Sequence, residues 1–235
     1  MKCCPDLLRF AAVVISCVAC SLALAADDEV RVDIVGKASK QPVKVINYAD
    51  LFPVLQKFDQ LHSLYPEGTL KFHFKPTNAS APRLQIYYAA GDEIRTVPTD
   101  AEGAFDLPID PDLARAHTIV YTTLPADYKA DFEFGWDVTR PDPTADATMG
   151  YYRLLCAVTE SYVSNFAGFA ARALVSLQGG LCHPFKLKAG PDVAGATLSW
   201  DGNSRFIAVE PAGTLSLPLQ DTGIPDSATV HRVPK

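Results

Sequence analysis

Several signatures of catalysis are missing from the 235 residues. The chain has no Gly-x-Ser-x-Gly elbow, no His-Glu-x-x-His, no phosphate-cradling glycine loop and, beyond residue 25, no Cys-x-x-Cys. No local motif therefore indicates the α/β-hydrolase, zincin, P-loop or dithiol chemistries that such patterns carry. We therefore predict no catalytic, cofactor-binding or metal-ligating residues and no cofactor.

Histidine is scarce, and no two histidines have the spacing of metal ligands; the five are His62, His73, His117, His183 and His231. His73 lies between Phe72 and Phe74 on an alternating segment, so it faces away from both phenylalanines. We interpret it as a solvated or hydrogen-bonded strand residue. His183 follows Cys182, which fits a reactive thiol, but a disulfide is the favoured interpretation for a secreted chain.

Positive charge is also in deficit, with 21 Lys and Arg against 27 Asp and Glu and a net charge of −6. No Lys/Arg cluster with interleaved aromatic residues offsets this deficit. A net acidic chain without such a cluster argues against a phosphate-backbone partner. We predict no nucleic-acid partner.

Long apolar runs are confined to the start of the chain. Residues 10–25 carry no charge, and Ala23-Leu24-Ala25 has the small-x-small pattern that signal peptidase cleaves after. We predict a signal peptide over residues 1–25 and a periplasmic or secreted protein. Cleavage would remove Lys2, Arg9 and Asp6, and the net charge of the mature chain would change from −6 to −7. We predict no transmembrane span in the mature chain.

A second interpretation of the leader remains open. Val14-Ile15-Ser16-Cys17 is similar to a bacterial lipobox, in which the cysteine is acylated and becomes the first residue. On this alternative the protein is a lipoprotein anchored through Cys17.

Only two cysteines, Cys156 and Cys182, remain after the leader. In an oxidising compartment an even pair predicts one disulfide. In the chain-entropy model, closing a loop of this length stabilises the fold by roughly 3.5 kcal/mol.

The first half of the mature chain predicts one helix among strands. A single helical stripe follows Asn47 or Asp50 as the cap, through Leu51, Val54, Leu55, Phe58, Leu61 and Tyr65. Pro53 is tolerable if it lies in a first turn capped by Asp50. Strands are predicted over residues 30–35, 43–46, 70–74, 84–88, 94–97, 105–109, 118–121 and 131–138.

The second half predicts a similar order. Residues 151–158 form a short apolar segment, residues 161–177 have helical spacing, and strands are predicted over residues 181–185, 196–200, 206–209, 215–219 and 228–231. The two halves share a glycine turn followed by alternating apolar residues, at residues 101–110 and 211–220. Matching order and spacing are typical of an internal repeat.

We therefore predict an α+β fold of two tandem, similar modules, each with one helix packed on a mainly antiparallel sheet. The first module covers residues 26–139, a Pro- and Asp-rich linker covers 140–149, and the second module covers 150–235. A shift of 111 residues maps Cys156 onto Val45 and Cys182 onto Lys71, so the disulfide would join the strands on either side of the second helix. Val45 and Lys71 should then lie side by side.

Two groups of side chains fit a binding role less well than a structural one. The first is a set of carboxylates that includes Asp110, Asp112, Asp142 and Asp146, which is too sparse for a dedicated calcium loop and is typical of solvated turns. The second is a set of aromatic residues, Tyr87, Tyr88, Trp136 and Trp200, that is more typical of strand packing than of a sugar or peptide surface.

One segment resembles a known family. Thr99-Asp100-Ala101-Glu102-Gly103-Ala104-Phe105-Asp106-Leu107-Pro108 is similar to the turn-and-strand signature of carboxypeptidase regulatory-like, transthyretin-like β-sandwich modules. More broadly, the chain resembles exported proteins of Gram-negative bacteria that carry no recognisable activity. The resemblance implies a noncatalytic accessory module and carries over no site residues.

The function predicted from the sequence is a noncatalytic envelope protein that binds a protein partner or a small ligand through strand edges or the groove between the halves. The alternative is a periplasmic hydrolase whose site assembles only in three dimensions. A histidine near a carboxylate and a Ser or Cys in a cleft would favour the alternative.

Overall fold

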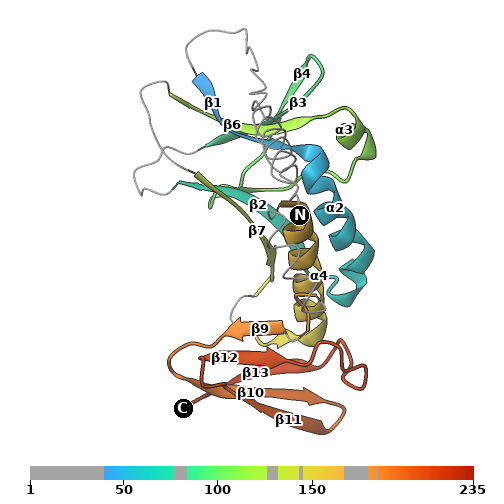
Figure 1. Ribbon diagram of the computed structural model, residues 1–235, viewed down its shortest axis with the longest axis vertical. Helices are drawn as coiled ribbons and strands as arrows, with labels where there is room; N and C mark the ends of the chain where they lie inside the picture. The colour runs from blue at the N-terminus through green and yellow to red at the C-terminus, as the bar shows by residue number, and fades with distance from the viewer. Residues whose placement is uncertain (1–39, 77–83, 126–131, 143–144, 167–179, 184) are drawn as a thin grey trace, which may run out of the picture. The chain divides into compact units, whose positions relative to one another are not determined.

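The computed structural model describes residues 40–76, 84–125, 132–142, 145–166, 180–183 and 185–235. Within them the chain forms helices and antiparallel strands (Figure 1), and the predicted α+β class is confirmed. The predicted signal peptide, the Cys17 acylation site and the strand predicted over residues 30–35 lie outside the described residues.

The first half contains a four-stranded sheet of order β1-β6-β3-β4 and a three-stranded sheet of order β5-β2-β7. Its elements are β1 (Lys40–Asn47), α2 (Tyr48–Leu61), a 3₁₀ turn (His62–Leu64), β2 (Thr69–Pro76), β3 (Gln85–Ala90), β4 (Glu93–Val97), β5 (Ala104–Phe105), α3 (Pro111–Arg115), β6 (Ile119–Pro125) and β7 (Phe132–Thr139).

The second half contains a four-stranded sheet of order β11-β10-β13-β8 and a two-stranded sheet of order β12-β9. Its elements are β8 (Ala147–Thr148), α4 (Met149–Phe166), β9 (Phe185–Lys188), β10 (Val193–Trp200), β11 (Asn203–Ala208), β12 (Thr214–Leu217) and β13 (Thr229–Pro234). β8 and the first residue of α4 lie within the segment 140–149.

Helix α2 follows the predicted stripe. Its N-cap is Asn47, whose side-chain oxygen accepts a hydrogen bond from the backbone N–H of Ala49. Leu51, Val54 and Leu55 are buried in the first core. Because the helix begins at Tyr48, Pro53 lies in the second turn, and the prediction of a first-turn proline capped by Asp50 is wrong.

Helix α4 corrects the sequence prediction for residues 151–177. The short segment 151–158 and the start of the helix predicted over 161–177 form one helix, Met149–Phe166, while residues 167–177 lie outside the described part of the chain. The reason is burial on two sides, because a helix that is apolar over most of its surface has no single stripe to recognise.

These two sides of α4 contribute to different hydrophobic cores. Leu154 and Val158 belong to the core around α2, β2 and β7. Met149, Tyr152 and Cys156 belong to the core around β10, β12 and β13. α4 therefore joins the two halves through apolar packing.

The strand orders of the two halves can be compared element by element. The order β1-β6-β3-β4 corresponds to β8-β13-β10-β11, and the pair β5-β2 corresponds to β12-β9, while β7 has no counterpart among the described residues. Each helix also begins with an equivalent bond, because the N–H of Tyr48 donates to the carbonyl of Thr118 and that of Met149 donates to Ala228, both at 2.8 Å.

Three details of the sequence prediction are wrong. β5 ends at Phe105 instead of residue 109, because Pro108 cannot donate to a strand ladder and Asp110 caps α3. In the second half, β9 begins at Phe185, and residues 181–183 form a turn. Val45 and Lys71 lie in different sheets, opposite Tyr121 and Asp137, so the expected pairing between them is not observed.

Candidate functional site

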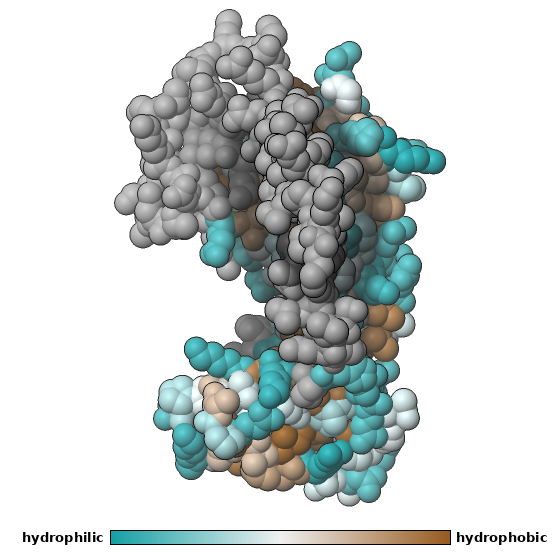
Figure 2. All heavy atoms as spheres, in the orientation of Figure 1, coloured by the Kyte–Doolittle hydropathy of each residue, from teal (hydrophilic) through white to brown (hydrophobic). Residues whose placement is uncertain are grey.

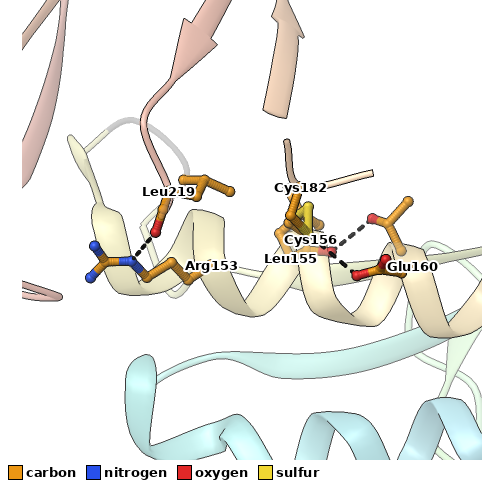
Figure 3. Close-up of a disulfide and its surroundings, with 7 residues drawn as sticks. Arg153, Leu155, Cys156, Glu160, Cys182 and Leu219 are labelled. Atoms are coloured by element: carbon orange, nitrogen blue, oxygen red, sulfur yellow. Dashed lines mark hydrogen bonds between the residues drawn. A yellow bond between two sulfur atoms is a disulfide. The ribbon is translucent and has the colours of Figure 1, made fainter. Parts of the chain in front are cut away.

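The predicted disulfide joins α4 to the turn before β9. Cys156 and Cys182 are bonded through Sγ, with their Cα atoms 5.8 Å apart, which is within the usual range for a disulfide (Figure 3). Cys156 is completely buried in the second core, and the carboxylate Oε2 of Glu160 lies 3.7 Å from the Cys182 Sγ. The bridge therefore ties the buried side of α4, at Cys156, to a half-buried turn at Cys182. The prediction that it joins two strands is wrong, because Cys156 lies in a helix.

Arg153, one turn before the disulfide, holds the segment between β12 and β13 (Figure 3). Its guanidinium donates hydrogen bonds to the carbonyl oxygens of Leu219, Asp221 and Ile224, each at 2.9 Å, and forms an ion pair with Asp226. A guanidinium presents five donors in a planar fork, so one side chain can satisfy several carbonyl groups of a loop. Arg153 therefore fixes this loop against α4.

The most distinctive exposed side chains lie on one side of the sheet β11-β10-β13-β8. Ala196 and Leu198 of β10 are fully buried in the second core, so Thr197 between them points to the other side. We call this other side, which carries Thr197, the outer face. In antiparallel sheets directly opposite residues share a face, and Thr197 is opposite both Phe206 of β11 and His231 of β13.

Asp146 completes a row of four side chains across the outer face. It immediately precedes β8, and its two carboxylate oxygens lie 2.9 and 3.0 Å from Nδ1 of His231. Because a carboxylate can only accept, Nδ1 of His231 carries the proton of this hydrogen bond. The row Phe206, Thr197, His231 and Asp146 thus combines an aromatic ring with hydroxyl, imidazole and carboxylate groups.

A second row of hydroxyl groups runs beside the first. Ser204 of β11, Ser199 of β10, Thr229 of β13 and Thr148 of β8 are opposite one another in register. Ser199, Ser204 and Thr229 are exposed, and Thr148 is half-buried. The outer face therefore presents exposed hydroxyl groups from three strands, whereas the Thr148 hydroxyl accepts a hydrogen bond from the N–H of Tyr151 in α4 at 3.2 Å.

Phe206 is the most exposed large apolar side chain among the described residues, at 57%. It lies next to Gly195, where a Cβ would overlap both the Phe206 ring and the carbonyl oxygen of Ile207. The absence of a side chain at Gly195 lets the ring lie against the backbone of β10. Figure 2 shows hydrophobic atoms among hydrophilic ones in the region that contains β9–β13.

The corresponding side of the first four-stranded sheet is different. Tyr87 of β3 is opposite Tyr121 of β6, and their rings stack with centroids 5.4 Å apart. Tyr121 is only 1% exposed, and burial raises the pKa of its hydroxyl. This position is closed to solvent, whereas the equivalent His231 is open.

Two further ion pairs lie near the second sheet, Lys186–Glu210 and Arg205–Asp221. Hydrogen bonds from Ser216, Lys186 and Thr214 lower the pKa of Glu210, which keeps it ionised beside the turn before β12. Arg205 on the edge strand β11 pairs with Asp221 at 3.2 Å. Within the described part of the chain, no group of three or more His, Cys, Asp or Glu side chains could hold a metal ion.

Several residues singled out from the sequence have structural roles. Asp110 caps α3 by accepting from the N–H groups of Asp112 and Leu113, and Asp112 pairs with Arg115. Trp136 packs on Tyr162 with centroids 5.8 Å apart, and Trp200 packs against the second core.

His73 lies on the side of β2 opposite Phe72 and Phe74, which are both buried. Its side chain is mostly buried, and its Nδ1 lies 3.8 Å from the carboxylate of Asp137. His183 is exposed in the turn beside the disulfide.

Sequence reasoning did not single out Phe206, Thr197 or His231 as a group, because they are distant in the chain. Alternation within β10 and β13 predicts which side each residue faces, but it does not give the register between strands. From the sequence alone, Asp146 is a carboxylate of the predicted linker. A pairing of β8 with the last strand is the signal that would have placed it beside His231.

No protein-family model, curated protein sequence or solved structure matches the chain. The local resemblance of residues 99–108 to transthyretin-like modules therefore stays a prediction. Among the described residues, no helix has both the length and the apolar character needed to cross a membrane.

Proposed function

We propose that this is an exported, noncatalytic binding protein of the bacterial envelope, and that it binds its ligand or partner on the outer face of β11-β10-β13-β8. The observation that carries the proposal is the row of Phe206, Thr197, His231 and Asp146, in which Thr197 is half-buried and the other three are exposed. An exposed aromatic ring beside convergent polar groups is typical of a recognition surface. Ion pairs account for Arg205 and Lys186, and packing accounts for Trp136 and Trp200.

Export rests on the charge-free segment of residues 10–25 and its small-x-small end. Mass spectrometry of the mature protein tests this step. An unmodified N-terminus at Ala26 supports a free periplasmic or secreted protein, and a lipid-modified Cys17 supports the lipoprotein. An intact Met1 contradicts export.

We also propose that the chain arose from duplication of one module, with β8 as the first element of the second copy. The shared strand orders and the equivalent helix-start bonds of Tyr48 and Met149 support this proposal. On these correspondences Cys156 is equivalent to Leu55 of α2, and both are buried. The copies differ on the side that carries the proposed site, because Tyr121 is buried where His231 is exposed.

Capture from envelope extract tests the proposed function. The immobilised mature chain is compared with Phe206→Ser and with Ile94→Ser, a matched control that removes an exposed apolar residue from the other edge strand, β4. We expect a component of the extract to be retained by the wild-type chain and by the Ile94→Ser control, and not to be retained by Phe206→Ser. Equal retention by all three proteins would place binding elsewhere and contradict the proposal.

The His231–Asp146 pair also favours a second candidate, the hydrolase. A histidine oriented by a carboxylate is two-thirds of a catalytic triad, and Thr197 is its cross-strand neighbour. Loss of esterase or glycosidase activity in His231→Gln would support this candidate. The binding role is favoured because the pair lies on an open sheet face, with His231 62% and Asp146 45% exposed, and does not exclude water from a reacting group.

A further inference from the structure

We infer that the ligand of the outer face is a neutral oligosaccharide that lies across the strands; this inference rests on the proposed function and specifies its ligand class.

The face is too small for a stable protein interface on its own. Four strands at about 4.8 Å spacing and five residues at about 3.4 Å rise cover roughly 300 Å². A standard protein–protein interface buries roughly 800 Å² on each partner and has an apolar core. Here Phe206 is the single aromatic side chain and Val233, which is half-buried, is the other apolar side chain of more than one carbon, while the remaining residues are Ser, Thr, Ala, Gly, His231 and Asp146.

The polar groups of the face match hydroxyl groups. Serine and threonine hydroxyls both donate and accept, as sugar hydroxyls do, and the Asp146 carboxylate is an acceptor. Thr197, Ser199, Ser204 and Thr229 are distributed over three adjacent strands in two rows. The row carries one carboxylate and one histidine and no Lys or Arg, so it has no charge complementarity to a phosphate or an anionic lipid surface.

Phe206 supplies the apolar contact that oligosaccharide recognition needs. Its ring lies against Gly195 at the edge of the sheet, so a flat surface is available for the C–H face of a sugar ring. Phe206 and His231 are two strands apart, roughly 10 Å. Two linked pyranose rings can span this distance, with one on Phe206 and the next above Thr197 and His231.

The test is an NMR titration of the ¹⁵N-labelled mature chain with chitohexaose and with maltohexaose. We expect at least one of them to shift the backbone amides of Thr197, Ser199, Phe206, Thr229 and His231. Phe206→Ala should weaken the binding about tenfold, because the loss of one aromatic contact is worth about 1.4 kcal/mol. Thr197→Val, which has nearly the same shape without the hydroxyl, should weaken it about fivefold.

The control is Ile94→Ala on the other edge strand, which should leave the affinity within about twofold. Amide shifts confined to other elements, or equal losses in Phe206→Ala and Ile94→Ala, would overturn the oligosaccharide site. If neither hexasaccharide binds while capture from envelope extract still depends on Phe206, the ligand class is wrong and the proposed function stands. If neither saccharide binding nor capture from envelope extract depends on Phe206, the ligand class and the proposed function are both wrong.

Discussion

Thr118 is a buried residue whose hydroxyl has no hydrogen-bond partner among the described residues. The residue at the same place in the second half is Ala228, which accepts the equivalent helix-start bond without a hydroxyl. A buried polar group without a partner costs about 1–3 kcal/mol. Thr118 is therefore a local weakness of the first half.

We predict that Thr118→Val stabilises the protein by about 1 kcal/mol, because it removes an unpaired hydroxyl and keeps the shape of the side chain. Thermal unfolding measures the change. Thr122→Val is the matched control, since the equally buried Thr122 hydroxyl donates to the carbonyl of Gln85 at 3.0 Å. The control should be destabilised by about 1 kcal/mol, and a loss of stability in both variants would contradict the prediction.

Buried tyrosine hydroxyls make the fold sensitive to alkaline pH. Burial raises the pKa of Tyr48 and of Tyr151, and the Tyr48 hydroxyl also donates to the carbonyl of Pro108 while it accepts from the N–H of Asp110 at 3.1 Å. Because the folded-state pKa exceeds the unfolded value, this stability is fully present below the unfolded pKa of about 10 and is lost as the pH rises through the folded pKa.

We therefore predict a free energy of unfolding that changes little with pH as it approaches 10 from below and falls above it. Denaturant unfolding at a series of pH values measures this dependence. Tyr151→Phe removes one ionisable hydroxyl and should flatten the alkaline decline. If the free energy of unfolding of Tyr151→Phe falls at alkaline pH as steeply as that of the wild type, Tyr151 does not contribute to this pH dependence.

At the scale of elements, Arg153 connects α4 to the segment between β12 and β13. Three carbonyl oxygens and Asp226 share its guanidinium, and the Arg153 side chain is 18% exposed. In the first half Tyr48 of α2 has a comparable task, because its hydroxyl contacts both Pro108 and Asp110 in the segment between β5 and β6. Each helix thus holds one loop, but with different chemistry.

Replacing Arg153 with Met keeps most of the side-chain volume and removes the donors. We predict that the free energy of unfolding falls by about 2–3 kcal/mol, because hydrogen bonds from a charged group are lost and buried carbonyl groups are left unpaired. Amide hydrogen exchange should be faster at Ile224 and Ala228, whose N–H groups bond within this loop. Arg205→Met is the control, because its exposed pair with Asp221 contributes little. Unchanged exchange at Ile224 would contradict the role of Arg153.

At the scale of the whole described structure, α4 couples the two halves. Its N-terminus approaches the 3₁₀ turn of the first half so closely that a Cβ on Gly150 would overlap the carbonyl oxygen of Leu64. The Gly150 N–H donates to the carbonyl of Asp226 in the second half at 2.9 Å. Tyr65 and Tyr151 pack edge to face beside this junction, with centroids 5.4 Å apart.

We predict that Gly150→Ala destabilises both halves by about 2 kcal/mol, because the new methyl group would force the backbone of Leu64 or of Gly150 to move. Trp136 lies in the first half and Trp200 in the second. In a Trp200→Phe background the remaining Trp136 reports unfolding of the first half by fluorescence, and in a Trp136→Phe background Trp200 reports unfolding of the second half. The two transitions should coincide and shift together. Ser164→Ala, exposed on the same helix, is the control. A shift in only one half would show that α4 does not couple them.

Much of the local structure could be predicted from the sequence, since it depends on neighbours along the chain. The α2 stripe through Leu51, Val54 and Leu55 and the glycine turns at Gly103 and Gly213, both with positive φ, are of this kind. The extent of α4 is not evident from the sequence, because its apolar residues contribute to two cores. The candidate site was not predicted, because register between strands joins residues as distant as Asp146 and His231.

The sequence by itself determined the α+β class, the positions of most strands and the pairing of Cys156 with Cys182, because alternation, helical spacing and the count of cysteines are properties of one chain. Only the tertiary structure decided that Cys156 lies in a helix shared by two cores and that Phe206, Thr197, His231 and Asp146 form one row. The physical reason is that burial and cross-strand register arise from contacts between distant segments, which local periodicity does not encode.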